Sequence, residues 1–283
     1  MAALLAYGLW GFLPIYFILV RGTAPEEVLM HRILWSVPVG VVIIHMRKQW
    51  GDVYRAFTTP RTLLTLTVTA ALIAFNWFTY IAAVQDGRVF ETSLAYYINP
   101  LFSVMAGVFL LKEQLRRKQK VAVGLAAIGV SALVIYGGAV PVSGMVLATT
   151  FTLYSLLRKQ ADVGAMPGLF VETLIMTPFA MAFLGWLIMT TDTGIASGDP
   201  RLIALLIFAG PATIIPLLFF AISARLLALG TLGFLQFLGP TIQFFVGVAD
   251  GEPFTLAHQI CFSFIWAAAG LFAWDAWRHR GTS

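Results

Sequence analysis

Long apolar runs dominate this chain, and short polar gaps separate them. Ten runs can be marked off, at residues 2–20, 27–46, 62–85, 91–111, 120–137, 142–157, 167–190, 202–224, 230–249 and 254–277. Each is close to the roughly 20 residues that a helix needs to cross a bilayer core, and none alternates strictly as a porin strand does. The pattern predicts an all-α integral membrane protein with ten transmembrane helices.

Composition agrees with the membrane class and excludes several others. Apolar residues make up 59% of the chain and charged residues 11%, whereas soluble domains carry roughly 25% charged residues. Cys261 is the single cysteine, so the sequence predicts neither a disulfide framework nor a cysteine metal cluster. HExxH and Walker-type motifs are absent, and we expect no metal and no cofactor. The net charge of +5 is a topology signal and does not indicate nucleic-acid binding.

Charge sorts by side along the chain. The even gaps and the C-terminal tail hold 14 of the 18 basic residues: Arg47, Lys48, Arg55, Arg61, Lys112, Arg116, Arg117, Lys118, Lys120, Arg158, Lys159, Arg225, Arg278 and Arg280. The odd gaps hold three basic residues and most of the acidic ones: Glu26, Glu27, Asp86, Glu91, Asp192, Asp199, Asp250 and Glu252. By the positive-inside rule, the even gaps face the cytoplasm. With ten spans, both termini are then cytoplasmic.

The chain repeats itself with an offset of 140 residues. Pro38 falls on Pro178 and Pro100 on Pro240, and the pattern of spans follows the same period. The sequence therefore divides into residues 1–138 and 139–283, each with five spans. An odd number of spans makes the second half enter the membrane from the opposite side. Inverted repeats of this kind are typical of secondary transporters, which work by alternating access.

Several stretches together resemble the RarD-type branch of the EamA family in the drug/metabolite transporter superfamily. They run from the first predicted span to the tenth: Leu9-Trp10-Gly11, His31-Arg32-Ile33-Leu34-Trp35-Ser36, Phe75-Asn76-Trp77, Tyr97-Ile98-Asn99-Pro100-Leu101, Arg158-Lys159, Gly233-Phe234-Leu235-Gln236-Phe237 and Gly251-Glu252-Pro253. The resemblance implies a ten-helix fold of two inverted five-helix repeats around a central cavity. It also implies export of small metabolites or drugs across a bacterial inner membrane.

Two charged residues lie inside predicted spans, at equivalent positions of the two repeats. A charge in a span is costly and marks a functional site by default. Because the repeats are inverted, Arg32 and Glu172 are separated by on the order of 15 Å along the membrane normal. We therefore expect Arg32 to face the outer mouth. The alternative is that Arg32 reaches the outer interface near Glu26 or Glu27.

Glu172 is expected to face the inner mouth of the same cavity. A buried carboxylate there is the natural candidate for proton coupling. The alternative is a structural ion pair with a base of the inner side, either Arg225 or Arg158.

Amide and aromatic side chains at helical spacing form polar stripes on the third, fourth and ninth spans. In hydrocarbon such groups must face protein or a wet cavity. The expected substrate-binding residues are Asn76, Tyr80, Tyr96, Asn99, Gln236, Gln243, Trp10 and Trp77. Amides also hold helices together in dry interfaces, and tryptophans often anchor the membrane interface. Helix breaks or hinges are expected at Pro38, Pro100, Pro178 and Pro240.

The sequence thus predicts a secondary transporter for a small, neutral or zwitterionic solute. Its expected partners are that solute and the lipid bilayer, and small residues in the fifth and tenth spans allow a homodimer. Two other classes compete with this interpretation. One is a membrane scaffold or assembly factor that transports nothing. The other is an intramembrane enzyme, which is disfavoured because His31 has no evident carboxylate partner in its span.

Overall fold

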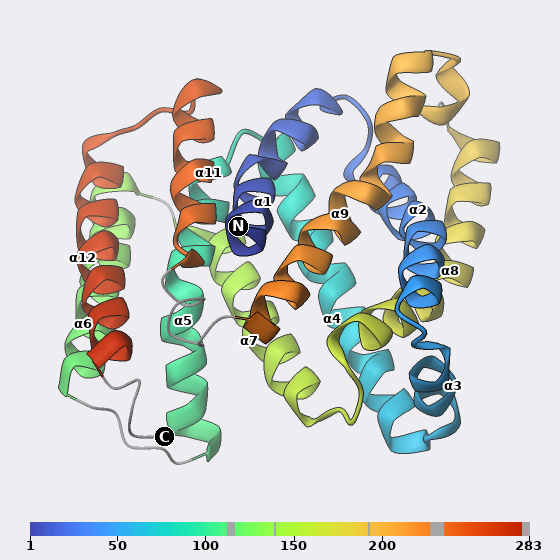
Figure 1. Cartoon of the computed structure of the whole chain (residues 1–283). Helices are drawn as coiled ribbons and strands as arrows, with labels where there is room; N and C mark the ends of the chain where they lie inside the picture. Colours follow the sequence, from blue (N-terminus) through green and yellow to red (C-terminus); the bar gives the residue numbers. More distant parts are fainter. Residues whose placement is uncertain (112–116, 139, 192, 227–234, 279–283) are drawn as a thin grey trace.

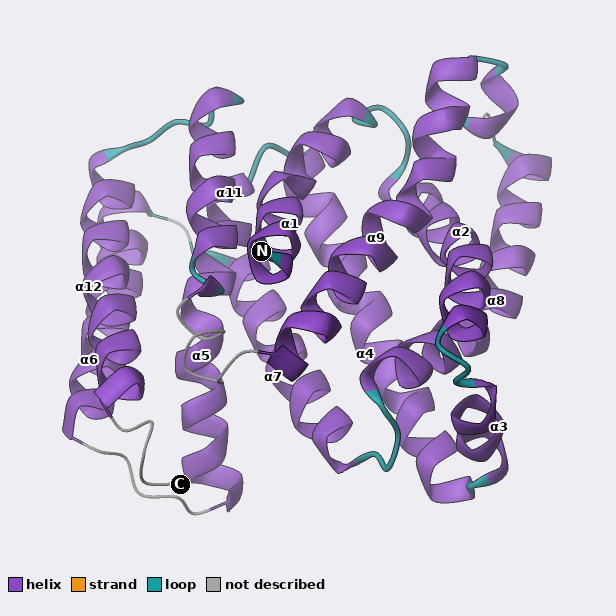
Figure 2. Cartoon of the chain, viewed as in Figure 1, coloured by secondary structure: helices purple, strands orange, loops and turns teal. Residues whose placement is uncertain are grey.

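The computed structural model is built of helices and loops (Figure 1). The structure describes the whole chain except residues 112–116, 139, 192, 227–234 and 279–283. No strand element occurs in the described part, where one isolated bridge joins Arg21 and Thr23 (Figure 2). The predicted all-α class is therefore confirmed for the described residues.

Each predicted apolar run overlaps one helix, and the shortest of these is α11, with 12 residues. The helices are α1 (Ala2–Leu19), α2 (Pro25–Met46), α3 (Trp50–Thr58), α4 (Pro60–Gln85), α5 (Val89–Leu111), α6 (Arg117–Gly137), α7 (Val142–Gln160), α8 (Ala165–Thr190), α9 (Pro200–Leu226), α11 (Leu238–Ala249) and α12 (Leu256–Arg278), with a 3₁₀ turn η1 (Ile195–Ser197). Within the described part, seven helices are long and apolar enough to cross a membrane: α1, α2, α4, α6, α8, α9 and α12.

Two of the four prolines predicted as helix breaks or hinges do not break their helices, and a hinge at these positions stays a prediction. The helices α2 and α8 continue through Pro38 and Pro178, as membrane helices can where neighbouring groups satisfy the freed backbone. Pro240 lies in the first turn of α11, where a missing N–H costs no helical hydrogen bond. Pro100 lies within α5, and its side chain is outside the described part.

The short helix α3 was not predicted from the sequence, which suggested only a polar gap. Val53 and Ala56 are buried against the ends of α2, α4 and α8, whereas Trp50 and Tyr54 are exposed. Apolar residues three apart in a gap rich in arginine and lysine are the signal of an amphipathic helix. Such a helix fits the boundary between headgroups and hydrocarbon.

The α1–α2, α4–α5 and α11–α12 connections lie toward one end of the molecule (Figure 1). At this end Arg21 contacts both Val84 and Asp250, which ties together the α1–α2, α4–α5 and α11–α12 connections. Helix α3 and the α7–α8 connection lie at the other end (Figure 1). We call these the acidic end and the basic end, after the charges that the sequence places in their loops.

Helices of the two sequence halves interleave. Many close helix pairs join residues 1–138 to residues 139–283, among them α2 with α8 and α9, α4 with α7 and α8, α1 with α9 and α11, and α5 with α7 and α11. The main core cluster accordingly takes Phe17, Ile33 and Trp77 from the first half and Leu169 and Leu206 from the second. Helices α6 and α12 pack on each other at one side of the molecule (Figure 1).

The two ends give a direct test of topology. Asp52 lies in α3 at the basic end, and Ser197 is exposed beside the acidic end. In a Cys261→Ala background, single cysteines at positions 52 and 197 are expected to react with a membrane-impermeant thiol reagent from opposite faces, position 197 from outside. Labelling of intact cells against inverted vesicles checks this. Reaction of both cysteines from the same face would contradict the arrangement.

Candidate functional site

Arg32 forms the centre of a buried site where four helices meet. The residue is 6% exposed, and its Nε donates a hydrogen bond of 2.8 Å to Thr213 Oγ1 of α9. Its guanidinium lies 4.2 Å from the ring centre of Trp77 on α4 and 5.8 Å from that of Phe17 on α1. The alternative in which Arg32 extends to an interfacial glutamate is therefore wrong. The side chain is held inside the helix bundle.

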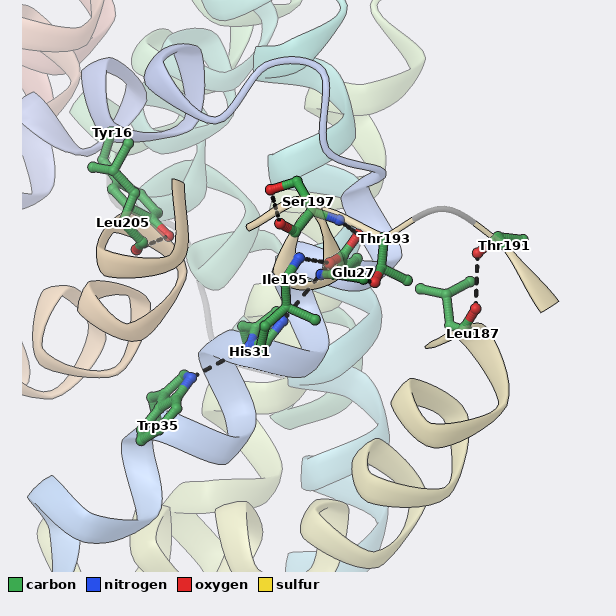
Figure 3. Close-up of polar contacts among 12 residues, drawn as sticks. Tyr16, Glu27, His31, Trp35, Leu187, Thr191, Thr193, Ile195, Ser197 and Leu205 are labelled. Carbon is green, nitrogen blue, oxygen red and sulfur yellow. Dashed lines mark hydrogen bonds and ion pairs between the residues drawn. The ribbon is translucent and has the colours of Figure 1, made fainter. Parts of the chain in front are cut away.

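Tyrosine side chains complete the surroundings of Arg32. Tyr16, Tyr80 and Tyr96 lie close enough for electrostatic interaction with the guanidinium. The Tyr80 ring packs edge-on against Tyr96, with 5.9 Å between ring centres. Tyr16 donates its hydroxyl hydrogen to the carbonyl of Leu205 at 3.0 Å (Figure 3). The Tyr80 hydroxyl is buried near Thr92 without a hydrogen bond of acceptable geometry.

A close helix contact sets the position of Thr213. A Cβ atom added at Gly210 of α9 would overlap the backbone carbonyl of Trp35 on α2. Glycine therefore lets the two helices approach one turn away from the bond between Arg32 and Thr213. Thr213 itself donates to the carbonyl of Ala209 at 2.8 Å, which leaves its oxygen free to accept from Arg32. Neither Gly210 nor Thr213 was selected from the sequence.

His31 has a carboxylate neighbour, so the statement that it lacks one is wrong. His31 Nε2 lies 3.8 Å from Glu27 Oε1, one helical turn earlier on α2. His31 Nδ1 accepts a hydrogen bond of 3.3 Å from Trp35 Nε1 (Figure 3). The i, i+4 spacing of Glu27 and His31 was the available sequence signal.

Glu27 nevertheless serves the chain backbone more directly than it serves His31. Its carboxylate accepts hydrogen bonds from the backbone N–H groups of Gly194 and Ile195, at 3.0 and 3.1 Å (Figure 3). These contacts satisfy the N-terminal donors of η1 and fix the α8–α9 connection. The Glu27 carboxylate is therefore a structural cap of this connection.

Glu172 lies in a second buried polar site, on α8 toward the basic end. Its side chain is fully buried, and Oε1 accepts a 2.6 Å hydrogen bond from Thr69 of α4. Oε2 accepts from the Tyr154 hydroxyl at 3.2 Å, and Arg158 Nε lies 3.3 Å from Oε1. Gly168 makes room for the Arg158 guanidinium, because a Cβ there would overlap it. The structure thus contains the ion pair with Arg158 that the sequence left as an alternative.

Two of the predicted amide residues hold helices together. Asn76 donates to the carbonyl of Leu147 at 3.0 Å and to Thr150 Oγ1 at 2.8 Å, both on α7. Gln243 of α11 donates to the carbonyl of Trp10 on α1 at 3.1 Å. Both amides therefore join helices, in the alternative role that the sequence left open.

The other predicted residues are placed as follows. Trp77, Tyr80 and Tyr96 lie around Arg32. Asn99, one turn beyond Tyr96, is half-buried, and its Oδ1 has no hydrogen-bond partner among the described residues. Gln236 lies in the turn before α11, and Trp10 packs against the rings of Tyr7 and Phe220. Convergence of all these residues on one cavity stays a prediction.

Polar contacts at the acidic end join the two halves. Arg21 pairs with Asp250 at 2.6 Å, and Glu252 Oε2 accepts a 2.8 Å hydrogen bond from the backbone N–H of Phe90 at the start of α5. We call these two contacts the acidic-end clasp. A hollow of about 280 Å³ lies between them and is also lined by Gln85. Each contact links residues 1–138 to residues 139–283, and neither was predicted from the sequence.

Glu252 has an unusual affinity for protons. Burial raises its pKa from 4.5 to about 7, and the backbone N–H groups of Phe90 and Val89 oppose this rise. The nearby carboxylates of Glu91 and Asp250 raise the pKa further. Glu252 thus titrates in the neutral range while it caps the first turn of α5.

Known proteins identify the family. Residues 1–135 match the model of the EamA-like transporter family. An uncharacterized transporter of Vibrio cholerae serotype O1 is 42% identical over 274 residues, which cover 96% of this chain and 91% of the relative. Protein RarD of Escherichia coli (strain K12) is 38% identical over 283 residues, with 99% and 96% covered. The chain belongs to the RarD-type branch of the EamA transporter family.

Two further comparisons extend this result. The chloramphenicol-sensitive protein RarD of Pseudomonas aeruginosa is 31% identical to this RarD-type chain over 271 residues, which cover 94% of the chain and 90% of the relative. A solved crystal structure that is 19% identical covers 98% of the chain and 96% of its own, with a TM-score of 0.62. That likeness concerns the fold alone. Together with its apolar helices, the family makes this protein a multi-pass membrane protein.

The ion pair between Glu172 and Arg158 can be tested by a double-mutant cycle of unfolding free energies. Glu172→Gln is expected to lower the free energy of unfolding by about 3–5 kcal/mol, because it leaves the Arg158 charge buried without a counterion. The double variant Glu172→Gln with Arg158→Gln is expected to recover part of that loss. Unfolding of the wild type, of Glu172→Gln and Arg158→Gln alone, and of the double variant in detergent checks both expectations. A fully stable Glu172→Gln protein that loses function would instead indicate proton coupling.

The raised pKa of Glu252 predicts a pH dependence. Its folded pKa of about 7 lies above the ordinary 4.5, so the proton stabilises the folded chain fully below pH 4.5 and this stabilisation is lost as pH rises through about 7. The wild type is therefore expected to lose unfolding free energy across this window relative to Glu252→Gln, which cannot titrate. Asp86→Asn, at the same end, should keep the wild-type slope. Equal slopes for wild type and Glu252→Gln would contradict the assignment.

Proposed function

We propose that this RarD-type protein is a secondary transporter of small metabolites or drug-like solutes in a bacterial inner membrane. Export is the expected direction, and the mechanism is alternating access between two inverted five-helix repeats. Residues 1–138 and 139–283 are the two repeats, which are arranged around a central cavity. The positive-inside rule supports a cytoplasmic basic end, with both termini on that side.

The symmetry of helix packing is the observation that carries the proposal. If α1, α2, α4 and α5 correspond to α7, α8, α9 and α11, then exchange of the halves turns the α2–α9 pair into α8–α4. It likewise turns α1–α9 into α7–α4 and α1–α11 into α7–α5. All six of these pairs are close contacts of the structure. The symmetry supports duplicated halves packed around a shared axis, which is the usual construction of alternating-access transporters.

Exchange of the two halves also relates the two buried polar sites to each other. Arg32 on α2 bonds Thr213 on α9, and Glu172 on α8 bonds Thr69 on α4. The charged residues are 140 positions apart, and the two threonines are 144 apart, which differs by one helical turn. Each charge is thus held by a threonine of the opposite half. Rocking of one repeat against the other would move both sites together.

The acidic-end clasp is the expected outer gate. It joins the two halves at the end that the positive-inside rule places outside. Solute can leave on that side only when these contacts separate. The described conformation is therefore interpreted as closed on the acidic side.

A scaffold or assembly factor remains the second candidate. A scaffold needs the same packing and does not need the clasp to open, so dependence of function on clasp opening distinguishes a transporter from a scaffold.

The peripheral pair α6 and α12 is the surface expected to form a homodimer. Gly129 of α6 is already used inside the chain, where it approaches the carbonyl of Cys261.

Locking the clasp tests transport. Arg21→Cys with Asp250→Cys, in a Cys261→Ala background, is bridged by a short bis-maleimide in intact cells. Chloramphenicol is a suitable first solute, since one relative is named for sensitivity to it, and a metabolite profile of cells with and without the protein supplies others. The bridge is expected to abolish the protein-dependent difference in solute level, because the outer gate cannot open.

Matched controls make the result specific. Each single-cysteine variant should produce the same difference in solute level with and without the reagent, because it cannot be bridged. A bridged protein that still produces the full difference would contradict alternating access through this end. A protein that produces no difference in any solute would favour the scaffold.

A further inference from the structure

Arg32 carries a buried positive charge for which the described part of the chain provides no counterion. Its Nε hydrogen is bonded to Thr213, and its guanidinium carbon lies over the rings of Trp77 and Phe17. Its two terminal amino groups make no hydrogen bond and no ion pair within the described part of the chain. An isolated charge in a low-dielectric interior is strongly unfavourable unless it is paired. The site therefore lacks a negative partner that physical chemistry demands.

The equivalent site in the other half shows what a completed arrangement contains. Glu172 has Arg158 within 3.3 Å and also accepts from Thr69 and Tyr154. Arg158 lies on α7, which corresponds to α1 under the exchange of halves. At Arg32, α1 supplies the uncharged Phe17 and Tyr16 instead. The protein thus neutralises one of its two symmetric charges and leaves the other open.

We propose that Arg32 binds the carboxylate group of the transported solute. This inference rests on the proposed transport function and names its substrate class: monocarboxylates, including zwitterions with a free carboxylate. The bond from Nε to Thr213 fixes the guanidinium plane, and Trp77 restricts its rotation. The remaining N–H groups of the fork match the two oxygens of a carboxylate in a bidentate geometry.

Charge balance favours a carboxylate over a phosphate. Arg32 is the one cation identified at this site among the described residues, and a single guanidinium neutralises one negative charge. Besides Thr213, the polar side chains that interact electrostatically with the guanidinium are Tyr16, Tyr80 and Tyr96. Tyr80 has an unbonded hydroxyl that supplies a further neutral donor. A doubly charged phosphate would remain partly uncompensated in this setting.

Binding to the purified full-length protein tests the proposal without reference to transport. The probes are matched pairs of acid and amide: acetate and acetamide, benzoate and benzamide, phenylacetate and phenylacetamide. Inorganic phosphate is added as a second anion. Ligand-dependent thermal stabilisation in detergent gives an apparent affinity for each probe. At least one acid is expected to bind about tenfold more tightly than its amide, since charge-assisted bidentate bonds are lost in the amide.

The variants separate a binding role from a structural one. Arg32→Lys retains the charge and loses the fork, so it is expected to weaken acid binding about tenfold and to leave amide binding unchanged. Arg32→Gln should abolish the preference for acids, and Arg32→Lys carries the test if the Gln variant does not fold. Arg55→Lys, in the exposed helix α3, can keep its contact with Asp52 and is the matched control, which should bind acids as the wild type does.

Three results would overturn the proposal. They are equal binding of acids and amides by the wild type, an acid preference that persists in both Arg32 variants, and phosphate binding tighter than that of every carboxylate. Failure of the locked-clasp experiment together with intact acid binding would reject the transport function and retain the site. Transport that depends on the clasp, with no acid preference, would reject the site and retain the function.

Discussion

The cost of placing charge in a low-dielectric interior governs the polar architecture of this protein. A buried ionisable side chain either has a partner in the protein or destabilises the fold until a ligand of opposite charge binds it. Glu172 is satisfied by Thr69, Tyr154 and Arg158. Arg32 has a hydroxyl and aromatic faces but no anion among the described residues. This difference between two symmetric positions separates a structural site from a binding site.

Close packing between the halves makes both sites possible. Side chains as short as threonine can bridge two helices only where their backbones approach closely. Gly210 permits that approach between α9 and α2. Where α2 meets α8, the ring of Phe170 occupies the space that a side chain at position 40 would need. These glycines act through the absence of a side chain, as small residues do at membrane helix interfaces generally. The positions of Thr213 and Arg32 therefore depend on residues that carry no chemistry of their own.

Sequence patterns predicted features that depend on composition and period. Apolar runs located the long helices, and the family resemblance is confirmed by relatives that cover nearly the whole chain. Features that depend on pairing were missed, because one sequence does not show which distant residues meet. Arg21 and Asp250 are 229 positions apart, and nothing local connects them. Asn76 and Gln243 were selected as membrane amides, and only the fold shows that each joins two helices.

The state of the clasp affects the free energy of the buried charge on Arg32. Opening the acidic end admits water, which stabilises an unpaired guanidinium. A dry, closed interior destabilises it. A bound carboxylate neutralises Arg32 and so lowers the cost of closure, whereas an empty site keeps that cost in full. It follows from the proposed binding site that the loaded protein interconverts between its two faces more readily than the empty one. A carrier with this property exchanges one solute for another faster than it changes conformation without solute. The rate of net solute transport is then limited by the conformational change of the empty carrier, in which Arg32 is unpaired.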